Sequence, residues 1–347
     1  MSVRMKEVAS RAGVSVKTVS NVVNGYVHVA PDTRERVQQA IDEMGYSPNL
    51  SARSLRSGRT GIIAVALPRL DEPYFAELAA AVIGVAAARG CTVLVDQTDG
   101  LLEREQRALA GIRPNLIDGL ILSPLALGAD QLRAPGVATP LVLLGERVSG
   151  SSFDHVAIDN VAAARLATGH LLDLGRRRLA GIGSMSTEVA QTARLRLAGF
   201  RSATAAAGLR VPDDHVQEVT AYRRDEGARA MDRLLDLPER PDAVYCFNDL
   251  LALGALHALH RRGLRVPEDV AVIGTDDIVE SSYSTPTLST VAQDVSEIAG
   301  LAVDVLLDRI GAGSHEPPRE LAASFSLRVR QSTVGTVRCP DEPRPFR

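Results

Sequence analysis

Polar side chains crowd a short stretch near the N-terminus, "VSVKTVSNVVNG" at residues 14–25. Hydroxyl, ammonium and amide groups of this kind hydrogen-bond phosphate oxygens and the edges of nucleic-acid bases. If the stretch is helical, Val16, Lys17 and Asn21 lie on its exposed side, near its beginning. The residue types therefore indicate recognition of a polyanion, and the surrounding elements must hold this face toward it.

Apolar spacing predicts three short helices around this stretch. Gly13 can take the positive φ that ends the first helix, and Ser15 is a suitable N-cap for the second. The third helix begins at about Pro31 and stops at Gly45. The predicted inward positions are Met5, Val8, Ala9, Ala12, Val19, Val22, Val23, Val37, Ala40, Ile41 and Met44. Three helices with one tight turn predict a helix-turn-helix domain over residues 1–46.

Charge is distributed unevenly along the chain. Residues 1–58 carry eight Lys and Arg against five Asp and Glu, a net charge of +3. The whole chain of 347 residues carries −3, so the remainder carries −6. A basic head on an acidic body is the asymmetry expected when the head meets a polyanion, although a merely solvated surface explains the charges equally well.

The segment "SPNLSARSLRSGRTG" is typical of a linker, because it is polar, basic and interrupted by Pro and Gly. Asn49 can nevertheless cap a short helix in which Ala52 and Leu55 share one face. A helix this short is unstable alone and needs a partner to fold. We therefore predict a hinge over residues 47–60.

From Gly61 onward, strand-like runs alternate with helical stretches. Runs such as "GIIAVALP", "DAVYCFN" and "DVAVIGT" are typical of buried parallel strands. Repeated βα units predict an α/β body of doubly wound parallel sheets, and its length favours two lobes over residues 61–335. Ligands of such sheets lie beyond the carboxyl ends of the strands, which favours a site between the lobes. The Pro- and charge-rich tail, residues 336–347, is predicted to be disordered.

Several functional classes are disfavoured by what the sequence lacks. It contains no GxGxxG after a strand, no Walker loop, no HExxH and no GxSxG elbow, so we expect neither enzyme activity nor a cofactor. Cys91, Cys246 and Cys339 have neither pairing nor metal-ligand spacing, which argues against disulfides and a metal site. Without a signal segment or a long apolar run, a cytoplasmic protein without membrane contact is expected.

Five segments together resemble the lactose-repressor/galactose-repressor (LacI/GalR) family of bacterial transcription regulators. They are "VKTVSNVVNG", "TRERVQQAIDEMGYSPNLSARSLRSGRTG", "GFRSA", "CFNDLLALGAL" and "VIGTDDIVESSYSTPTLSTVAQD". The resemblance runs from about Arg4 to Ser332. It implies a helix-turn-helix head, a hinge helix and a two-lobe body like periplasmic sugar-binding proteins.

The resemblance also implies a function. A homodimer would bind a near-palindromic double-stranded DNA operator, most often as a repressor, under the control of a small-molecule effector. A sugar or sugar derivative is the favoured effector class. The tetrameric members carry a C-terminal leucine heptad, and the tail of this chain shows no such repeat, so a dimer is expected.

DNA contacts are implied in the head and in the hinge. Val16, Lys17 and Asn21 fall on base-reading positions, and Leu55 falls on the leucine that wedges into a central base step. The other matching positions are Ser15, Thr18, Ser20, Asn24 and Thr33 for phosphate contacts, and Asn49 and Ala52 for the hinge helix. Simpler explanations stay open, because Ser15 also suits a helix cap and Leu55 could pack on the body.

An effector site is implied between the lobes. Phe75 falls where the family stacks a ring on the effector, and the fork of Arg196 can bind two sugar hydroxyls or a carboxylate. The other matching positions are Glu146, Tyr222, Asn248, Asp276 and Gln293. As an alternative, Asn248 and Asp276 could cap helices, and Arg196 could pair with an acid at the surface.

Two departures from the family pattern concern the effector. Gly145-Glu146-Arg147 stands where sugar-sensing members often carry Asp-Arg, and Glu72 replaces the usual Asn before the Pro-aromatic motif. The competing function is a sugar-binding protein without regulatory DNA binding. That function explains the body but leaves the helix-turn-helix head without a role.

Overall fold

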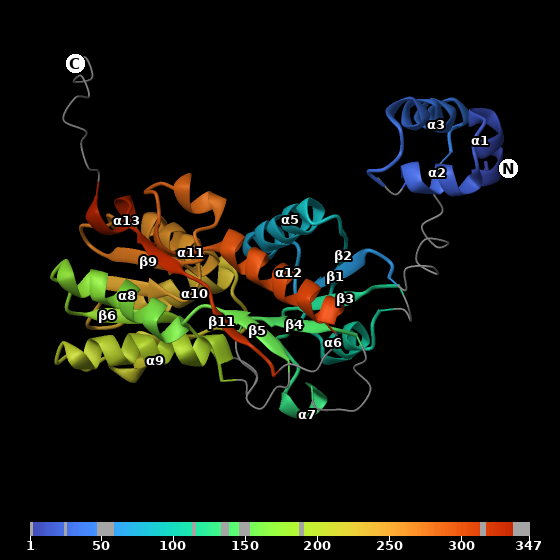
Figure 1. Ribbon diagram of the computed structural model, residues 1–347. Helices are drawn as coiled ribbons and strands as arrows, with labels where there is room; N and C mark the ends of the chain where they lie inside the picture. The colour runs from blue at the N-terminus through green and yellow to red at the C-terminus, as the bar shows by residue number, and fades with distance from the viewer. Residues whose placement is uncertain are drawn as a thin grey trace, which may run out of the picture. The chain divides into compact units, whose positions relative to one another are not determined.

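The computed structural model describes residues 3–23, 26–46, 59–112, 116–132, 139–145, 153–186, 191–312 and 317–335. The chain divides into two compact units, one up to Gly61 and one from Ile62. Figure 1 shows the first unit as three helices and the second as an α/β body. Most of the predicted hinge, residues 47–58, lies outside the described residues.

Three helices form the first unit, which we call the head. They are α1 (Met5–Ala12), α2 (Val16–Val23) and α3 (Pro31–Met44). Gly13 ends α1 at φ +64° and Gly45 ends α3 at φ +60°, as predicted. Val8, Val19 and Val37, one from each helix, have no exposed surface and form the centre of the head. The predicted helix-turn-helix fold is confirmed.

The strands of the second unit, the body, form two six-stranded sheets. The strands are β1 (Ile62–Leu67), β2 (Thr92–Gln97), β3 (Gly119–Leu122), β4 (Leu141–Leu144), β5 (Asp154–Ala157), β6 (Leu179–Ser184), β7 (Val216–Glu218), β8 (Ala243–Cys246), β9 (Ala271–Thr275), β10 (Ser289–Gln293), β11 (Glu320–Ala322) and β12 (Phe325–Arg328). Sheet A has the order β11-β5-β4-β3-β1-β2, and sheet B the order β12-β10-β9-β8-β6-β7. All the pairings are parallel except β10 with β12. The predicted parallel α/β body is confirmed, with one antiparallel edge strand that was not predicted.

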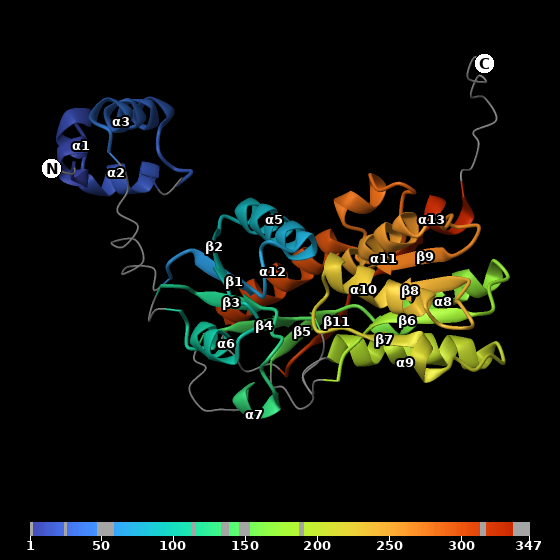
Figure 2. The same ribbon diagram turned by 180° about the vertical axis from the view of Figure 1, so that it is seen from behind.

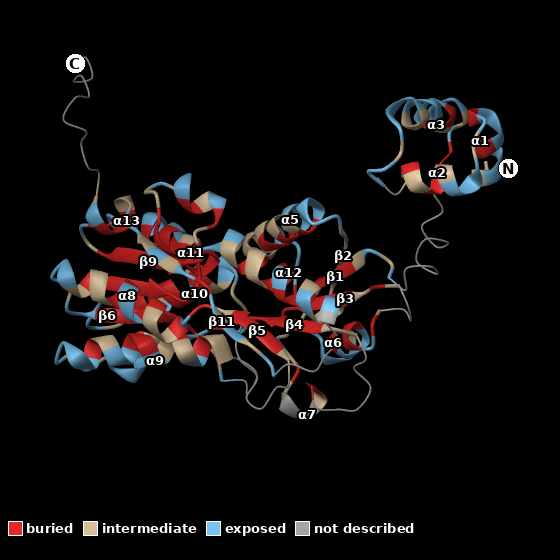
Figure 3. Cartoon of the chain, viewed as in Figure 1, coloured by how far each residue is buried: buried red, intermediate tan, exposed pale blue. Residues whose placement is uncertain are grey.

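Helices cover both faces of each sheet. They are α5 (Pro73–Ala88), α6 (Leu102–Leu109), α7 (Ala129–Leu132), α8 (Asn160–Asp173), α9 (Gln191–Ala206), α10 (Arg224–Leu235), α11 (Asp249–Arg261), α12 (Val295–Ala312) and α13 (Gln331–Val334). Side chains of β8 alternate: Tyr245 packs with α8 and α9, whereas Val244 and Cys246 pack with α10 and α11. In sheet A, α5 and α12 lie on one face and α6 on the other. Figure 1 shows α8 and α9 side by side, Figure 2 shows α10 and α11 on the opposite side, and Figure 3 shows how completely the central strands are buried.

The chain passes between the sheets three times. These crossovers lie between β5 and α8, between β10 and α12, and between β11 and β12. The second and third are tied together, because Asp294 N–H donates to the Ser324 carbonyl at 3.0 Å. The Glu297 carboxylate also accepts the Ser324 N–H at 2.7 Å. Each sheet with its helices is therefore a lobe, and the lobes share three adjacent connections.

Candidate functional site

The turn between α1 and α2 is fixed by internal hydrogen bonds. Val14 N–H donates to the Ala9 carbonyl at 3.0 Å across the left-handed Gly13. Ser15 Oγ accepts the Thr18 N–H at 3.1 Å and lies 2.8 Å from the Thr18 hydroxyl. Ser15 is therefore the N-cap of α2, as predicted. A phosphate contact by Ser15 or Thr18 stays a prediction.

The start of α2 presents two of the three predicted base-reading side chains to solvent. Val16 is 44 % exposed and Lys17 is exposed, and neither side chain makes a hydrogen bond or ion pair with the described residues. Asn21 is half-buried. Ser20 is only 8 % exposed, because it lies on the buried side of α2 next to Val19. A phosphate contact by Ser20 stays a prediction, for a residue that the structure places on the buried side of α2.

For the remaining predicted DNA-contact residues and Glu146 the structure gives partial burial in one case and no description in five. Thr33 is half-buried in the first turn of α3. Five predicted site residues lie outside the described residues, namely Asn24, Asn49, Ala52, Leu55 and Glu146. Their contacts with DNA or effector stay predictions.

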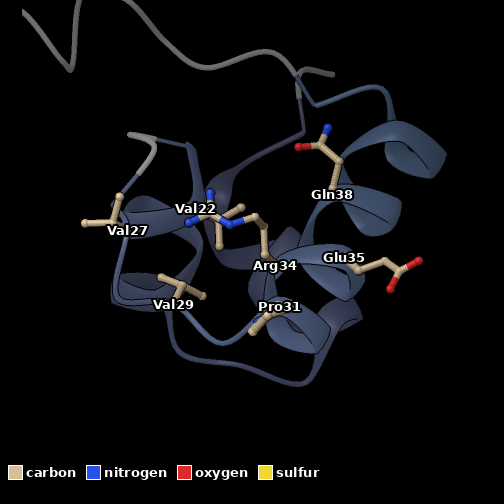
Figure 4. A pocket seen from close by; sticks show the side chains of 7 residues that line it. All are labelled: Val22, Val27, Val29, Pro31, Arg34, Glu35 and Gln38. Atoms are coloured by element: carbon tan, nitrogen blue, oxygen red, sulfur yellow. The ribbon is translucent and has the colours of Figure 1, made fainter.

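An open pocket of about 630 Å³ lies at the junction of α2 and α3. Figure 4 shows its lining, which is Val22, Val27, Val29, Pro31, Arg34, Glu35 and Gln38. Arg34 Nη2 donates to the Tyr26 carbonyl at 2.6 Å, which closes the loop before α3. Glu35 and Gln38 are exposed, so the pocket offers no buried polar group that would select a ligand.

In the body, three predicted effector residues meet at the carboxyl ends of β9 and β10. Asp276 directly follows β9, and Gln293 is the last residue of β10. Gln293 Nε2 donates to Asp276 Oδ1 at 2.8 Å, and Arg196 Nη2 lies 3.7 Å from the same oxygen. Arg196 is 5 % and Asp276 9 % exposed. A buried guanidinium, a carboxyl group and an amide are thus brought together from segments up to 97 residues apart in the printed sequence.

Two residues that the sequence analysis missed complete this group. The Tyr74 hydroxyl, on α5 of the other lobe, donates to Gln293 Oε1 at 3.3 Å. Asn160 Oδ1, at the start of α8, accepts from Arg196 Nε at 2.7 Å. We call Tyr74, Asn160, Arg196, Asp276 and Gln293 the interlobe cluster. The proximity of Tyr74 to Phe75 was a signal for the first, but no local pattern pointed to Asn160.

Burial changes the ionisation of the acids around the cluster. It raises the pKa of Asp276 to about 6, against the opposing charge of Arg196, and the charge of Glu77 adds to the rise. Burial also raises the pKa of Glu72 to about 7, and the charge of Asp276 contributes. Glu72 precedes α5 in one lobe and Asp276 follows β9 in the other, so the two lobes influence each other's protonation.

The other predicted effector residues have their own local roles. The half-buried ring of Phe75 lies edge-on to Tyr74, with centroids 5.3 Å apart. The Tyr222 hydroxyl donates to the Gly183 carbonyl at 3.2 Å. Asn248 is 5 % exposed and accepts a backbone N–H from the first turn of α11 at 2.9 Å. Asn248 is therefore the N-cap of α11, the simpler explanation that had stayed open.

A buried acid supports the segment that carries Asp276. The Asp249 carboxyl group has no exposed surface and accepts from Ile278 N at 3.1 Å. It also accepts from the hydroxyls of Ser281 and Thr290, both at 2.7 Å. Burial raises the pKa of Asp249 well above its usual range. Asp249 was not singled out from the sequence, because its partners lie 29 to 41 residues away.

Two negative findings apply to the described part of the chain. No helix there is both long enough and apolar enough to cross a bilayer. No three His, Cys, Asp or Glu side chains in these ranges come together as metal ligands.

Comparison with known proteins now places the chain. A model of bacterial regulatory proteins of the lacI family matches residues 4–49, and a model of the periplasmic binding protein-like domain matches residues 168–333. The ribose operon repressor of Escherichia coli (strain K12) is 36% identical over 309 residues, covering 88% of this chain and 92% of the relative. The chain belongs to the LacI family.

Further similarities of this LacI-family chain agree with that assignment. The HTH-type transcriptional repressor PurR of Aliivibrio fischeri (strain MJ11) is 33% identical over 316 residues, covering 90% of this chain and 93% of the relative. The structure of the lac repressor dimer bound to operator and the anti-inducer ONPF superimposes with a TM-score of 0.83. It is 28% identical and covers 96% of this chain and 99% of that chain. The LacI-family chain is therefore a DNA-binding transcriptional regulator with a small-molecule effector, and not an enzyme.

Proposed function

We propose that this LacI-family chain is a homodimeric repressor of a near-palindromic operator, controlled by a carbohydrate held in the interlobe cluster. The observation that carries the proposal is the buried meeting of Arg196, Asp276 and Gln293 at the strand ends. Fork-shaped donors beside a carboxyl group suit vicinal hydroxyls, which donate and accept at once. The aromatic pair Tyr74 and Phe75 supplies an apolar face for a sugar ring.

The head is the DNA-reading part of this proposal. A helix-turn-helix lays the start of its second helix in the major groove. In this proposal Lys17 donates to guanine O6 and N7, Asn21 pairs with adenine, and Val16 touches a thymine methyl. Ser15, Thr18, Ser20, Asn24 and Thr33 are the proposed phosphate contacts. Ser20 is only 8 % exposed, so in this assignment it contributes mainly through its backbone N–H.

The hinge connects the head to the effector. Asn49, Ala52 and Leu55 are proposed to form a helix on DNA, with Leu55 inserted at a central base step. Unstacking a step costs a few kcal/mol, which is offset because kinked DNA touches more of the protein surface. Leu55→Ala should therefore weaken operator binding far more than binding to random DNA. An equal loss on both would refute the wedge.

A homodimer is supported by the symmetry that a near-palindrome requires. The body offers apolar surface for such an interface. Tyr283 is 82 % exposed and Val279 60 % exposed, both in the segment after β9. Apolar side chains that are exposed close together mark interaction surfaces, so we assign this segment to the dimer contact.

The effector assignment is tested by thermal shift with a panel of D-ribose, D-glucose, cellobiose and hypoxanthine. A bound ligand raises the melting temperature of the state it binds. A sugar should stabilise the wild-type chain and the Arg194→Ala variant, whose arginine is exposed on the same helix. Arg196→Ala should lose the shift, although its melting temperature without ligand should also fall, because Asp276 and the Phe247 carbonyl lose a buried partner. Stabilisation by hypoxanthine alone would overturn the carbohydrate proposal.

The competing function, sugar binding without DNA regulation, is tested by gel retardation. The full chain should retard an operator that is selected from a random DNA library. Its affinity for that operator should rise or fall when the sugar is added. A chain that starts at Gly61 lacks the head and should not retard it. Equal retardation by both chains would contradict the regulator proposal.

A further inference from the structure

The orientation of Arg196 depends on a side chain from another helix. Arg196 projects from α9, and its Nε donates to Asn160 Oδ1 at 2.7 Å. Its Nη1 donates to the Phe247 carbonyl. Asn160 is 4 % exposed and is the first residue of α8. Because the guanidinium group is planar, two held nitrogens fix the direction of the third, and Nη2 is then directed toward Asp276.

A close approach of α8 and α9 makes this contact reachable. Gly199 lies three residues after Arg196, on the same side of α9. A Cβ at Gly199 would stand 2.4 Å from the Val161 carbonyl oxygen and 2.7 Å from Ala164 Cβ. The two helices therefore touch through backbone at this level, and the short Asn160 side chain spans the remaining gap.

The distance between Arg196 and Asp276 allows one hydroxyl group beside the pair to contact both side chains. Their closest atoms are 3.7 Å apart, longer than the 2.7–2.9 Å, roughly, of a charge-assisted hydrogen bond. A hydroxyl group of the effector can accept from Nη2 and donate to the carboxyl group, provided that the guanidinium plane is held. Asn160 holds it, and it does so directly after the first crossover between the lobes.

We propose that Asn160 is a positioning residue for effector recognition, which aligns Arg196 with Asp276. Because Asn160 directly follows the first crossover, it also connects effector binding at these two side chains to that crossover. The proposal rests on the proposed effector role of Arg196. Asn160 itself need not touch the ligand. Loss of its side chain should remove one of the two anchors of the guanidinium plane, so that Nη2 is no longer directed toward Asp276.

Calorimetric titration of the full chain with the panel sugar that gives the largest thermal shift, D-ribose first, tests the effect on affinity. Asn160→Ala should raise the dissociation constant by about 10-fold or more, as expected for a lost hydrogen bond to a charged group. Asn160→Asp keeps the acceptor and should restore most of the affinity. Asp159→Ala is the matched control, because the one side-chain hydrogen bond of Asp159 within the described residues caps α8, from Ala162 N at 2.9 Å. That variant should lose melting temperature but keep its affinity.

The outcomes separate this proposal from the proposed function. If Arg196→Ala weakens sugar binding and Asn160→Ala does not, Asn160 has no positioning role. If neither variant weakens it, the effector assignment of Arg196 itself fails. If Asn160→Ala and Asp159→Ala lose affinity in proportion to their loss of melting temperature, the role of Asn160 is only structural.

A second measurement needs no ligand. The Arg196 Nε–H in ¹⁵N-arginine-labelled protein should exchange slowly with water in the wild type, because it is buried and hydrogen-bonded, and Arg196→Lys identifies its signal. The signal should persist in Asp159→Ala and Asn160→Asp and disappear by fast exchange in Asn160→Ala. An unchanged signal in Asn160→Ala would overturn the proposal, even where no sugar of the panel binds.

Discussion

Replacing Glu72 by Gln should stabilise the protein above pH 7 and leave its stability unchanged near pH 4.5. Burial raises the pKa of Glu72 from 4.5 to about 7, more than the nearby Arg69 lowers it. Each pKa unit corresponds to about 1.4 kcal/mol, so the upper limit of the effect is about 3 kcal/mol. We expect about 2 kcal/mol, because 23% of the side chain stays exposed and solvent screens the charge.

The sign follows from proton linkage. Between pH 4.5 and pH 7 the folded chain keeps the Glu72 proton and the unfolded chain loses it. The folded state then binds more protons, so the free energy of unfolding falls as the pH rises through this window. Gln cannot ionise, so the variant avoids that loss. Below pH 4.5 both states of the wild type are protonated and the two proteins should be equally stable.

Urea unfolding of both proteins at pH 4.5, 6, 7 and 8 measures the difference directly. It should grow from zero to its full value by pH 8. Asp71→Asn is the control, because it removes a negative charge from the residue that precedes Glu72. Asp71 is exposed, and its hydrogen bond with Arg69 lowers its pKa. That variant should gain no stability over the window. A constant difference between Glu72→Gln and wild type from pH 4.5 to 8 would refute the burial argument.

Two further predictions concern the head and the packing of the body. Lys17→Ala should lower operator affinity roughly 10-fold and reduce the salt dependence of binding. Lys6→Ala, which replaces the other lysine of the head, should leave discrimination between operator and random DNA intact. If Lys17→Ala loses as much affinity for random DNA as for the operator in a filter-binding assay, Lys17 does not read bases. Gly254→Ala should destabilise the body by about 2–3 kcal/mol, since its Cβ would stand 1.9 Å from the Arg224 carbonyl oxygen. Gly300→Ala, with nothing within 4 Å, should be neutral or stabilising by up to about 1 kcal/mol, and a similar urea midpoint for the two variants would contradict the packing argument.

Long periodic segments were predictable because their pattern is local. The three helices of the head, and strands such as β1, β8 and β9, coincide with runs whose side-chain spacing repeats over a few residues. The three-residue strands β7 and β11 were missed, as were β10 and β12. They lie next to crossovers or at sheet edges, where pairing with a distant strand decides the conformation and the short run carries no period.

The site residues divide in a similar way. Arg196, Asp276 and Gln293 were expected from the family resemblance, and the fold brings them within contact. Tyr74 and Asn160 were found only in the tertiary structure. Tyr74 contacts Gln293, 219 residues away, and Asn160 contacts Arg196, 36 residues away.

By itself, the sequence determined the three helices of the head and the longer buried strands, that a basic head precedes a two-lobe body, and which family the chain resembles. These properties follow from residue spacing, turn residues and charge, all of which act over a few neighbouring positions. Only the tertiary structure decided that Ser20 faces inward, that Asn248 caps a helix, and that Asn160 holds Arg196. Burial and hydrogen bonding between distant segments depend on how helices and sheets pack, and no local pattern encodes that packing.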